Sequence, residues 1–406
     1  MRHVLAVLLA LALLPSALVS ATEGPSFAWF DMLNDAGFYT QPGRMALDEA
    51  HGVLYQVGTA WGRRGPARKA FAGAFVAKYS LDGEREWLRI YDDELPGYGY
   101  GIGVGPDGNV YLVGIAPGTE ATGATDSVLV ALRPDGSVRW TRRLEGETID
   151  GLFTVAVHGD RVLVGGSLFD PTGATECERR ETAFVAEYDT EGHWRYFTRW
   201  GGPSIIKSVA FGPGGNAIVA GGRGHDCGTA SASPGSGGFV SRLDRRGMIR
   251  RTEFAAGLGT IEGIAFGHGA MYLLGSHHIK LPPYEGGTAA VARMGRGGSI
   301  LWTRSLTLGE KPIEGSALSA SGLLVAVAGS TDNALDPPKA ALIVLRANGT
   351  FSSRWEVPDS KGYSHATAVA VLADGDVAVG AFAADRIGEE RPFGRGSAWL
   401  ARLRFE

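Results

Sequence analysis

A short hydrophobic segment with a tight turn in its middle and a glycine at its end recurs along the chain. Residues 102–114 (IGVGPDGNVYLVG) and 209–221 (VAFGPGGNAIVAG) show the pattern. β-Branched and aromatic residues flank a pair such as Asp-Gly or Gly-Gly, which predicts two strands joined by a hairpin turn. Seven copies occur at spacings of 51 to 56 residues, and their final glycines are Gly58, Gly114, Gly165, Gly221, Gly275, Gly329 and Gly380.

A second segment follows each of the first six copies, for example residues 74–87 (AFVAKYSLDGEREW). The turn glycines of these segments are Gly83, Gly136, Gly192, Gly247, Gly298 and Gly349. In four segments an aromatic residue lies four positions after the glycine (Trp87, Trp140, Tyr196, Trp302). We expect these rings to pack in the core and at its rim rather than to stack on a ligand. Each period then supplies four strands, which is the content of one propeller blade.

The two ends of the chain complete this pattern. The seventh copy ends with residues 399–405 and lacks a fourth strand, while residues 27–33 (FAWFDML) precede the first copy as an unpaired strand. The N-terminal strand therefore completes the last blade and leaves no free sheet edge. The sequence predicts an all-β fold, a seven-bladed β-propeller of four-stranded antiparallel blades, with residues 22–406 as a single domain.

The first strand of each copy alternates small and large residues. The small positions are Ala46, Gly103, Ala156, Ala210, Ala265, Ala317 and Ala370. Because successive side chains of a strand point to opposite faces, each blade has a smooth face and a knobbed face near the axis. Stacking of knobbed on smooth faces around a ring gives dense packing.

Residues 1–21 have the pattern of a signal peptide, with a basic start, the apolar run Val4–Leu14 and a small-x-small site before Thr22. The apolar run is too short to cross a hydrocarbon core of about 30 Å. We therefore expect a secreted or periplasmic protein without a membrane span.

Composition narrows the function classes. The formal charge of −4 and the pI near 6.2 argue against a nucleic-acid binder. The 61 glycines show no triplet period, which excludes collagen and favours a turn-rich β protein. We expect a monomer without a cofactor, whose partner is a protein, a glycan or an anionic surface.

The repeated units GIGVGPDGNVYLVG and AFVAKYSLDGEREW resemble the bacterial secreted β-propeller repeat that occurs in seven-bladed arrays. The resemblance covers nearly all of residues 22–406 and implies the fold, but it implies little about function. Quinoprotein-type repeats are also similar, although the Thr-Gly that usually precedes their Trp strand is absent from this chain.

The gaps between the second and third strands of each blade are long and share one face, where binding loops usually occur. The first gap carries Arg63, Arg64, Arg68 and Lys69, and the last adds Arg391 and Arg395. Arginine side chains suit carboxylate, phosphate or sulfate ligands. The alternative is a set of solvated charged loops.

Both cysteines, Cys177 and Cys227, fall in equivalent gaps of adjacent blades. An even count in an exported chain predicts a disulfide bond. The alternative is a metal site, with His225, Asp226, His277 and His278 as weak candidate ligands that lack a recognised spacing.

A third group of residues lies near the axis, before the large residues of the first strands: Tyr100, Phe153, Lys207, Glu262, Glu314 and Thr367. Lys207, Glu262 and Glu314 come from consecutive blades and are expected to converge at a central funnel. They could act as acid and base if their pKa values differ. The alternative is an ion-pair network that only stabilises the fold.

Recognised hydrolase, metalloprotease and phosphate-loop motifs are absent from the sequence. The pattern therefore favours an exported, non-enzymatic binding scaffold that uses the face with the long gaps. Two alternatives stay open: a propeller hydrolase or lyase acting at the central funnel, and a metal- or quinone-dependent redox protein.

Overall fold

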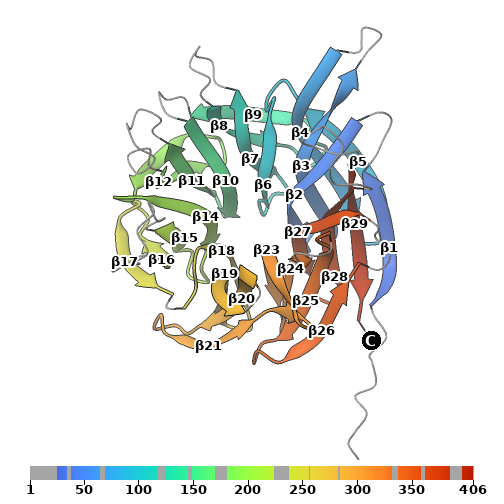
Figure 1. Cartoon of the computed structure of the whole chain (residues 1–406). Coiled ribbons are helices and arrows are strands. Elements are labelled where there is room, and N and C mark those ends of the chain that lie inside the picture. The colour runs from blue at the N-terminus through green and yellow to red at the C-terminus, as the bar shows by residue number, and fades with distance from the viewer. Residues whose placement is uncertain are drawn as a thin grey trace, which may run out of the picture.

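The computed structural model describes residues 25–33, 38–64, 69–117, 125–144, 149–169, 181–223, 237–255, 257–281, 284–331, 337–357, 362–384 and 396–405. These residues form seven antiparallel sheets around a central axis (Figure 1). The chain is a seven-bladed β-propeller, as predicted. Among the described residues there is no helix with the length and hydrophobicity of a membrane span.

The blades follow one another along the chain, and in each the first strand lies nearest the axis. Blade 1 contains β2 (Phe38–Asp48), β3 (Val53–Arg64), β4 (Lys69–Ser80) and β5 (Arg85–Tyr91). Blade 2 contains β6 (Tyr98–Val104), β7 (Val110–Pro117), β8 (Thr125–Leu132) and β9 (Val138–Leu144). Blade 3 contains β10 (Ile149–His158), β11 (Arg161–Phe169), β12 (Glu181–Asp189) and β13 (Trp194–Arg199).

Blade 4 contains β14 (Ser204–Phe211), β15 (Ala217–Arg223), β16 (Gly237–Leu243) and β17 (Ile249–Phe254). Blade 5 contains β18 (Ile261–Gly267), β19 (Ala270–Leu281), β20 (Tyr284–Met294) and β21 (Ile300–Ser305). Blade 6 contains β23 (Lys311–Ser321), β24 (Leu324–Thr331), β25 (Ala340–Arg346) and β26 (Phe351–Glu356), with the two-residue strand β22 (Thr307–Leu308) added beside β23. Blade 7 contains β27 (Tyr363–Val371), β28 (Val377–Ala384) and β29 (Gly396–Arg404).

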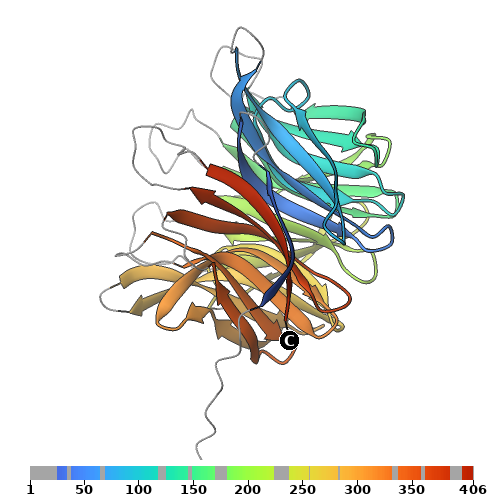
Figure 2. The ribbon, with the colours of Figure 1, turned by 90° about the vertical axis from the view of Figure 1, so that its right-hand side faces the viewer.

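The N-terminal strand β1 (Ser26–Leu33) closes the ring. It pairs antiparallel with β29, so that blade 7 has the order β1-β29-β28-β27 (Figures 1 and 2). This confirms that the first strand of the chain completes the last blade. Because β1 covers the outer edge of β29, that strand's backbone groups are paired on both sides.

The hydrophobic core consists of seven clusters, each shared by two neighbouring blades. The cluster between blades 7 and 1 includes the fully buried Leu33 of β1. Burial of apolar area contributes roughly 25 cal/mol per Å² and is the main driving force for this packing. A blade buries its faces only against its neighbours, so the ring is stable as a whole rather than blade by blade.

The predicted aromatic residues pack between blades. The outer strand of one blade places a ring against the turn glycine of the next: Trp29 at Gly83, Trp87 at Gly136, Trp140 at Gly192, Tyr196 at Gly247 and Trp302 at Gly349. The six predicted turn glycines have φ between +78° and +95°, a region that residues with a Cβ rarely adopt. A larger residue would be strained at all six, and at five of them it would also meet the ring; Gly298 faces the side chain of Glu253 instead. The expected packing role of these aromatics is confirmed.

Hydroxyl groups also join successive blades. In three blades a side chain at the start of the inner strand accepts a hydrogen bond from a backbone N–H of the third strand of the preceding blade. The pairs are Ala398 N to Thr40 Oγ1 (2.9 Å), Ala183 N to Ser204 Oγ (3.1 Å) and Ala340 N to Ser364 Oγ (2.9 Å). Each bond satisfies a buried donor and fixes the angle between blades.

Blade 6 differs from the predicted register. Its bulge lies between Gly315 and Ala317, so Ala317 is equivalent to Gly101, the residue directly after the bulge of blade 2. Ser319, not Ala317, therefore occupies the position of Ala46 and Gly103. The slip is two residues, so the alternation of small and large residues could not reveal it.

Two of the predicted long gaps are mainly strand. β3 and β4 continue their pairing to Arg64 and Lys69, and β19 and β20 continue theirs to Leu281 and Tyr284. Figure 1 shows the β3–β4 ribbon extending beyond the ring. The polar residues in these segments suggested loops, but the antiparallel ladder continues through them.

Candidate functional site

Each inner strand has a β-bulge at the same place. The pairing of the inner with the second strand shifts between Gly99 and Gly101 in blade 2, and at the equivalent point in every other blade. A bulge inserts an unpaired residue and redirects its side chain. The bulged residues are Arg44 with Gly43 in blade 1, and then Tyr100, Phe153, Lys207, Glu262, Ser316 and Thr367.

This set largely agrees with the predicted axial residues, with one correction and one addition. Glu314 is not equivalent to Glu262, because it pairs regularly with Ser330; Ser316 holds that position. The two-residue slip of blade 6 explains this error as well. Arg44 was missed because Gly43 holds the position of Tyr100 in blade 1, and Arg44 follows it at the position that Gly101 and Thr154 hold in blades 2 and 3.

Arg44 crosses the axial channel. Its Nη2 donates to the backbone carbonyl of Glu262, which lies in blade 5, at 3.2 Å. Burial lowers the pKa of Arg44, and the negative charge of Glu262 acts in the opposite direction. The guanidinium therefore joins two blades that are not neighbours and stands across the channel.

The axial channel opens on the face where the inner strands begin, and we call this opening the mouth. Aromatic side chains form one side of it. Tyr98 stacks on Tyr100 with ring centroids 6.1 Å apart, and Tyr100 lies 5.6 Å from Phe153. The Nζ of Lys207 lies 5.2 Å from the centre of the Phe153 ring. Tyr98 is 41% exposed, so the end of this row is accessible. Burial, followed by the neighbouring Tyr98, raises the pKa of Tyr100, and its hydroxyl stays protonated at neutral pH.

On the opposite side, a histidine joins two serines of blade 6. Nε2 of His365 lies 2.7 Å from Oγ of Ser316, and Nδ1 lies 2.8 Å from Oγ of the buried Ser330. Tyr363 stacks on the imidazole at 6.4 Å. Burial lowers the pKa of His365, although the charge of Glu314 opposes this. A neutral imidazole has one N–H, so one serine hydroxyl donates to the ring and the other accepts from it.

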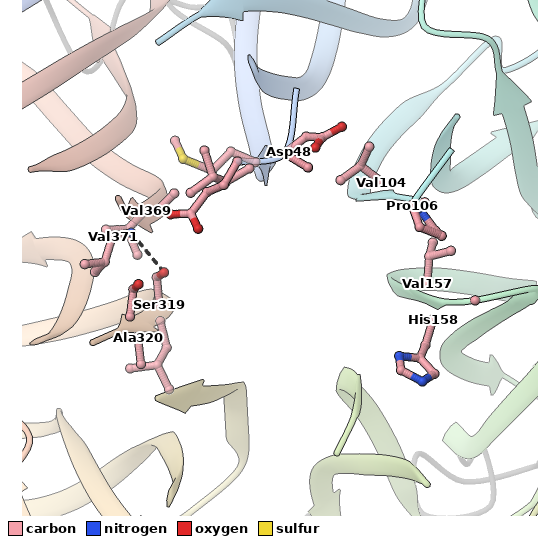
Figure 3. A pocket seen from close by; sticks show the side chains of 18 residues that line it. Asp48, Val104, Pro106, Val157, His158, Ser319, Ala320, Val369 and Val371 are labelled. Atoms are coloured by element: carbon pink, nitrogen blue, oxygen red, sulfur yellow. Dashed lines mark hydrogen bonds between the residues drawn. The ribbon is translucent and has the colours of Figure 1, made fainter. Parts of the chain in front are cut away.

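The described residues line two cavities along the axis. The larger, of about 800 Å³, opens at the end with the short turns and is lined by Val104, Val157, His158 and residues of blades 1, 6 and 7. Figure 3 shows Val104, Pro106, Val157 and His158 on one side of it and Ser319, Ala320, Val369 and Val371 on the other. A smaller chamber, of about 140 Å³, lies next to it toward the bulges and includes Arg44 and Lys207 in its wall.

Lys207, Glu262 and Glu314 do not form the ion-pair network that was the alternative to catalysis. In the described part of the chain, no carboxylate lies within 4.0 Å of the Lys207 amine, which contacts Phe153 instead. Within the described ranges there is also no group of three or more His, Cys, Asp or Glu side chains arranged to hold a metal ion.

The structure places only part of the predicted loop sites. Arg63 is exposed near the end of β3 and pairs with Ala70, and Arg64 pairs with Lys69 at the tip of the same ribbon. His277 and His278 are consecutive residues of β19. The remaining candidates, namely Arg68, Arg391, Arg395, Cys177, Cys227, His225 and Asp226, lie outside the described residues. The disulfide, the basic patch and the metal site stay predictions.

Comparison with known proteins supports the fold alone. No protein-family model and no curated protein matches the sequence. The chain is similar to the WD40 domain of Pan2 from Neurospora crassa, with a TM-score of 0.51, 11% identity and coverage of 90% of this chain and 91% of that chain. The β-propeller domain of the Trilobed protease from Pyrococcus furiosus has a TM-score of 0.49 at 10% identity, covering 84% and 91%. Sqt1 from Chaetomium thermophilum has 0.47 at 11%, covering 92% and 100%.

Proposed function

We propose that this protein is an exported, non-enzymatic binding scaffold whose ligand docks at the axial mouth on the face with the long gaps. The observation that supports this is the chemistry of the bulge position. Other repeated positions hold similar residues in successive blades, as the turn glycines do. In blades 2 to 7 the bulge position instead holds Tyr, Phe, Lys, Glu, Ser and Thr, which packing of equal blades does not require, and in blade 1 the bulge contains Gly43 and Arg44.

A glycan fits this mouth best. The row of Tyr98, Tyr100 and Phe153 offers flat apolar faces for the C–H surface of a sugar ring. Lys207 and Glu314 can exchange hydrogen bonds with its hydroxyl groups. Small-molecule binding sites typically combine aromatic walls with a few polar groups that fix the orientation of the ligand. A protein partner and an anionic surface, the other expected ligands, are the competing outcomes of the test.

Export is part of the proposal. It is supported by the signal-peptide pattern of residues 1–21 and by the resemblance to bacterial secreted propeller repeats. An oxidising compartment would also permit the proposed Cys177–Cys227 disulfide bond. Mass spectrometry of the unreduced chain after proteolysis tests the bond, and two free thiols would contradict it.

A glycan array with the chain that begins at Thr22 tests the binding proposal. We expect saturable binding of a glycan that Tyr100→Ala weakens by about ten-fold or more, because a well-packed aromatic contact is worth roughly 1–2 kcal/mol. The control is Trp194→Ala, which removes a 63% exposed aromatic from β13 on the outer rim. Equal binding by the two variants, or binding only to proteins or to anionic vesicles, contradicts a glycan site at the mouth.

The serine–histidine contact favours a second candidate, hydrolysis at the channel. Ser316 and the neutral His365 have the spacing of a nucleophile and its base, with Ser330 fixing the far side of the ring. Hydrolysis of p-nitrophenyl acetate that disappears in Ser316→Ala would support an enzyme. Loss of turnover in Glu262→Ala or Glu314→Ala, with Ser316→Ala active, would point instead to the carboxylates. Glycan binding that is retained in Ser316→Ala and Glu262→Ala, with no turnover in the parent chain, supports the scaffold.

A further inference from the structure

The axial chamber of about 140 Å³ has an unusual combination of wall groups. Apolar side chains such as Met45, Ile102, Val155, Leu318 and Val369 form much of its wall. Four polar side chains complete it: Arg44, Thr154, Lys207 and Ser208. All four can present hydrogen-bond donors to the chamber.

The two cations are poorly partnered. Arg44 has five N–H donors, and one of its nitrogens bonds the Glu262 carbonyl at 3.2 Å. Lys207 contacts the Phe153 ring at 5.2 Å. In the parts of the chain that the structure describes, neither has a carboxylate within 4.0 Å. Burial of Arg44 lowers the pKa of its guanidinium, and the negative charge of Glu262, whose carboxylate is not in contact with it, offsets this only in part.

The two hydroxyls are oriented by the neighbouring blades. Thr154 Oγ1 accepts a hydrogen bond from Val209 N at 3.2 Å, and Ser208 Oγ accepts one from Ile264 N at 3.1 Å. Each oxygen already serves as an acceptor, so its own O–H is left as a donor. Among the described residues neither O–H donates a hydrogen bond. The inter-blade bonds thus turn both hydroxyls into donors next to the chamber.

Acidic groups are absent from the wall residues of the chamber but present at the neighbouring funnel. The lining of the chamber includes no Asp or Glu, whereas Asp48 and Glu49 line the 800 Å³ funnel. The field of these carboxylates disfavours an anion at the short-turn end, and the cations favour it in the chamber. Along the axis, the charges of these wall residues therefore favour an anionic ligand in the chamber over one in the funnel.

We propose that the axial chamber is a binding site for a small oxyanion, such as sulfate or phosphate, held by Arg44 and Lys207 with the hydroxyls of Thr154 and Ser208. A volume of about 140 Å³ corresponds to roughly four or five times the 30 Å³ that a water molecule occupies in the liquid. It accommodates a tetrahedral anion of five heavy atoms. The site shares Lys207 with the proposed glycan site at the mouth, whereas Arg44, Thr154 and Ser208 belong to the chamber alone, so titration with inorganic anions tests it separately.

Isothermal titration calorimetry with inorganic sulfate and with phosphate, at constant ionic strength, tests the site. We expect one saturable site that is weakened about ten-fold or more in Arg44→Gln, since charge-assisted hydrogen bonds are the strong ones. Lys207→Gln should weaken binding several-fold. The control, Arg346→Gln, removes an exposed cation at the end of β25 and should leave the affinity within about two-fold of the parent.

Absence of saturable binding, or equal affinity in Arg44→Gln, Lys207→Gln and Arg346→Gln, overturns the proposal. Should Arg44→Gln fail to fold, Lys207→Gln carries the test, because the Lys207 amine contacts only an aromatic ring in the described structure. Thermal unfolding gives a second readout. Sulfate should raise the melting temperature of the parent, and Lys207→Gln should lose most of that shift.

Glucuronate distinguishes a free anion from the charged end of a larger ligand. If glucuronate binds more tightly than sulfate and Tyr100→Ala removes that advantage, the chamber holds the acidic group of a sugar whose ring lies at the mouth. If glucuronate binds no more tightly, the free anion is the ligand. Both results require binding that depends on Arg44 and Lys207.

Discussion

The residues at the bulges are the ones whose identity the fold leaves open. In blades 2 to 7 one residue of the inner strand is unpaired at the bulge, and in blade 1 Gly43 and Arg44 lie between the paired residues. A bulge redirects the side chain of its unpaired residue. Bulges are common next to functional sites for this reason. Single residues at this level, such as Ser316 with its neighbour His365, decide the chemistry of the channel.

We predict that the contribution of His365 to stability depends on pH. Burial lowers its pKa below the unfolded value near 6.5, so the unfolded chain binds more protons as pH falls through that value. The stability that the neutral, doubly hydrogen-bonded imidazole contributes is present above pH 6.5 and is lost as pH falls toward the folded pKa.

Urea unfolding of the parent and of His365→Asn between pH 8 and pH 5 measures this. At pH 8 the variant should be less stable by about 1–3 kcal/mol, because two buried hydrogen bonds change. The difference between parent and variant should shrink on acidification. A difference that stays constant over the whole range would show that His365 is not held neutral by burial.

At the scale of the strand, β1 is the element on which the ring depends most directly. Trp29 stacks on Tyr79 of blade 1 with ring centroids 5.7 Å apart, and its Nε1 donates to the Leu81 carbonyl at 3.0 Å. The same hydrogen bond occurs between Trp140 and Thr190 of the next blade. β1 therefore makes the contacts of a regular outer strand, although it comes from the other end of the chain.

We expect Trp29→Ala to lower the free energy of unfolding by about 2–3 kcal/mol, since it removes a stacked, hydrogen-bonded ring between two blades. The matched control is Trp194→Ala on β13, where the side chain is 63% exposed and the cost should stay within about 0.5 kcal/mol. Equilibrium urea unfolding compares the two. Equal destabilisation by both substitutions would mean that the contact of β1 with blade 1 contributes nothing.

At the scale of the whole molecule, stability depends on closing the ring. Leu33 of β1 is fully buried in the cluster between blades 7 and 1. Thr40 donates to the Leu33 carbonyl at 2.5 Å and accepts from Ala398 N at 2.9 Å, so it ties both chain ends to blade 1. Each blade has its hydrophobic faces covered only when this last interface forms.

Deletion of residues 22–36 should therefore abolish cooperative folding. It removes β1, leaves the edge of β29 unpaired and exposes the apolar cluster between the first and last blades. We expect aggregation in size-exclusion chromatography and no sharp thermal transition in circular dichroism. The comparison is the chain that begins at Thr22 and keeps β1. A truncated form that melts like this parent would falsify closure by strand exchange.

The candidate site was predictable only in part. The alternation of residues placed Tyr100, Phe153, Lys207, Glu262 and Thr367 correctly. It placed Glu314 where Ser316 lies, because a slip of two residues preserves the face on which a side chain points. The Ser316–His365 contact joins residues 49 positions apart in two blades, so no local pattern indicates it.

The sequence by itself determined the architecture. The recurring hydrophobic segments and their turn glycines indicate the repeat and the number of blades, and the unpaired strand at residues 27–33 indicates how the ring closes. These features are local or repeated, and each blade repeats the same signal. Only the tertiary structure decided which side chains meet on the axis. Arg44 reaches the Glu262 carbonyl, 218 residues away, because ring closure and the bulges bring blades 1 and 5 to face each other. The spacing of the sequence repeat specifies the blades, but it does not specify which residues meet across the ring.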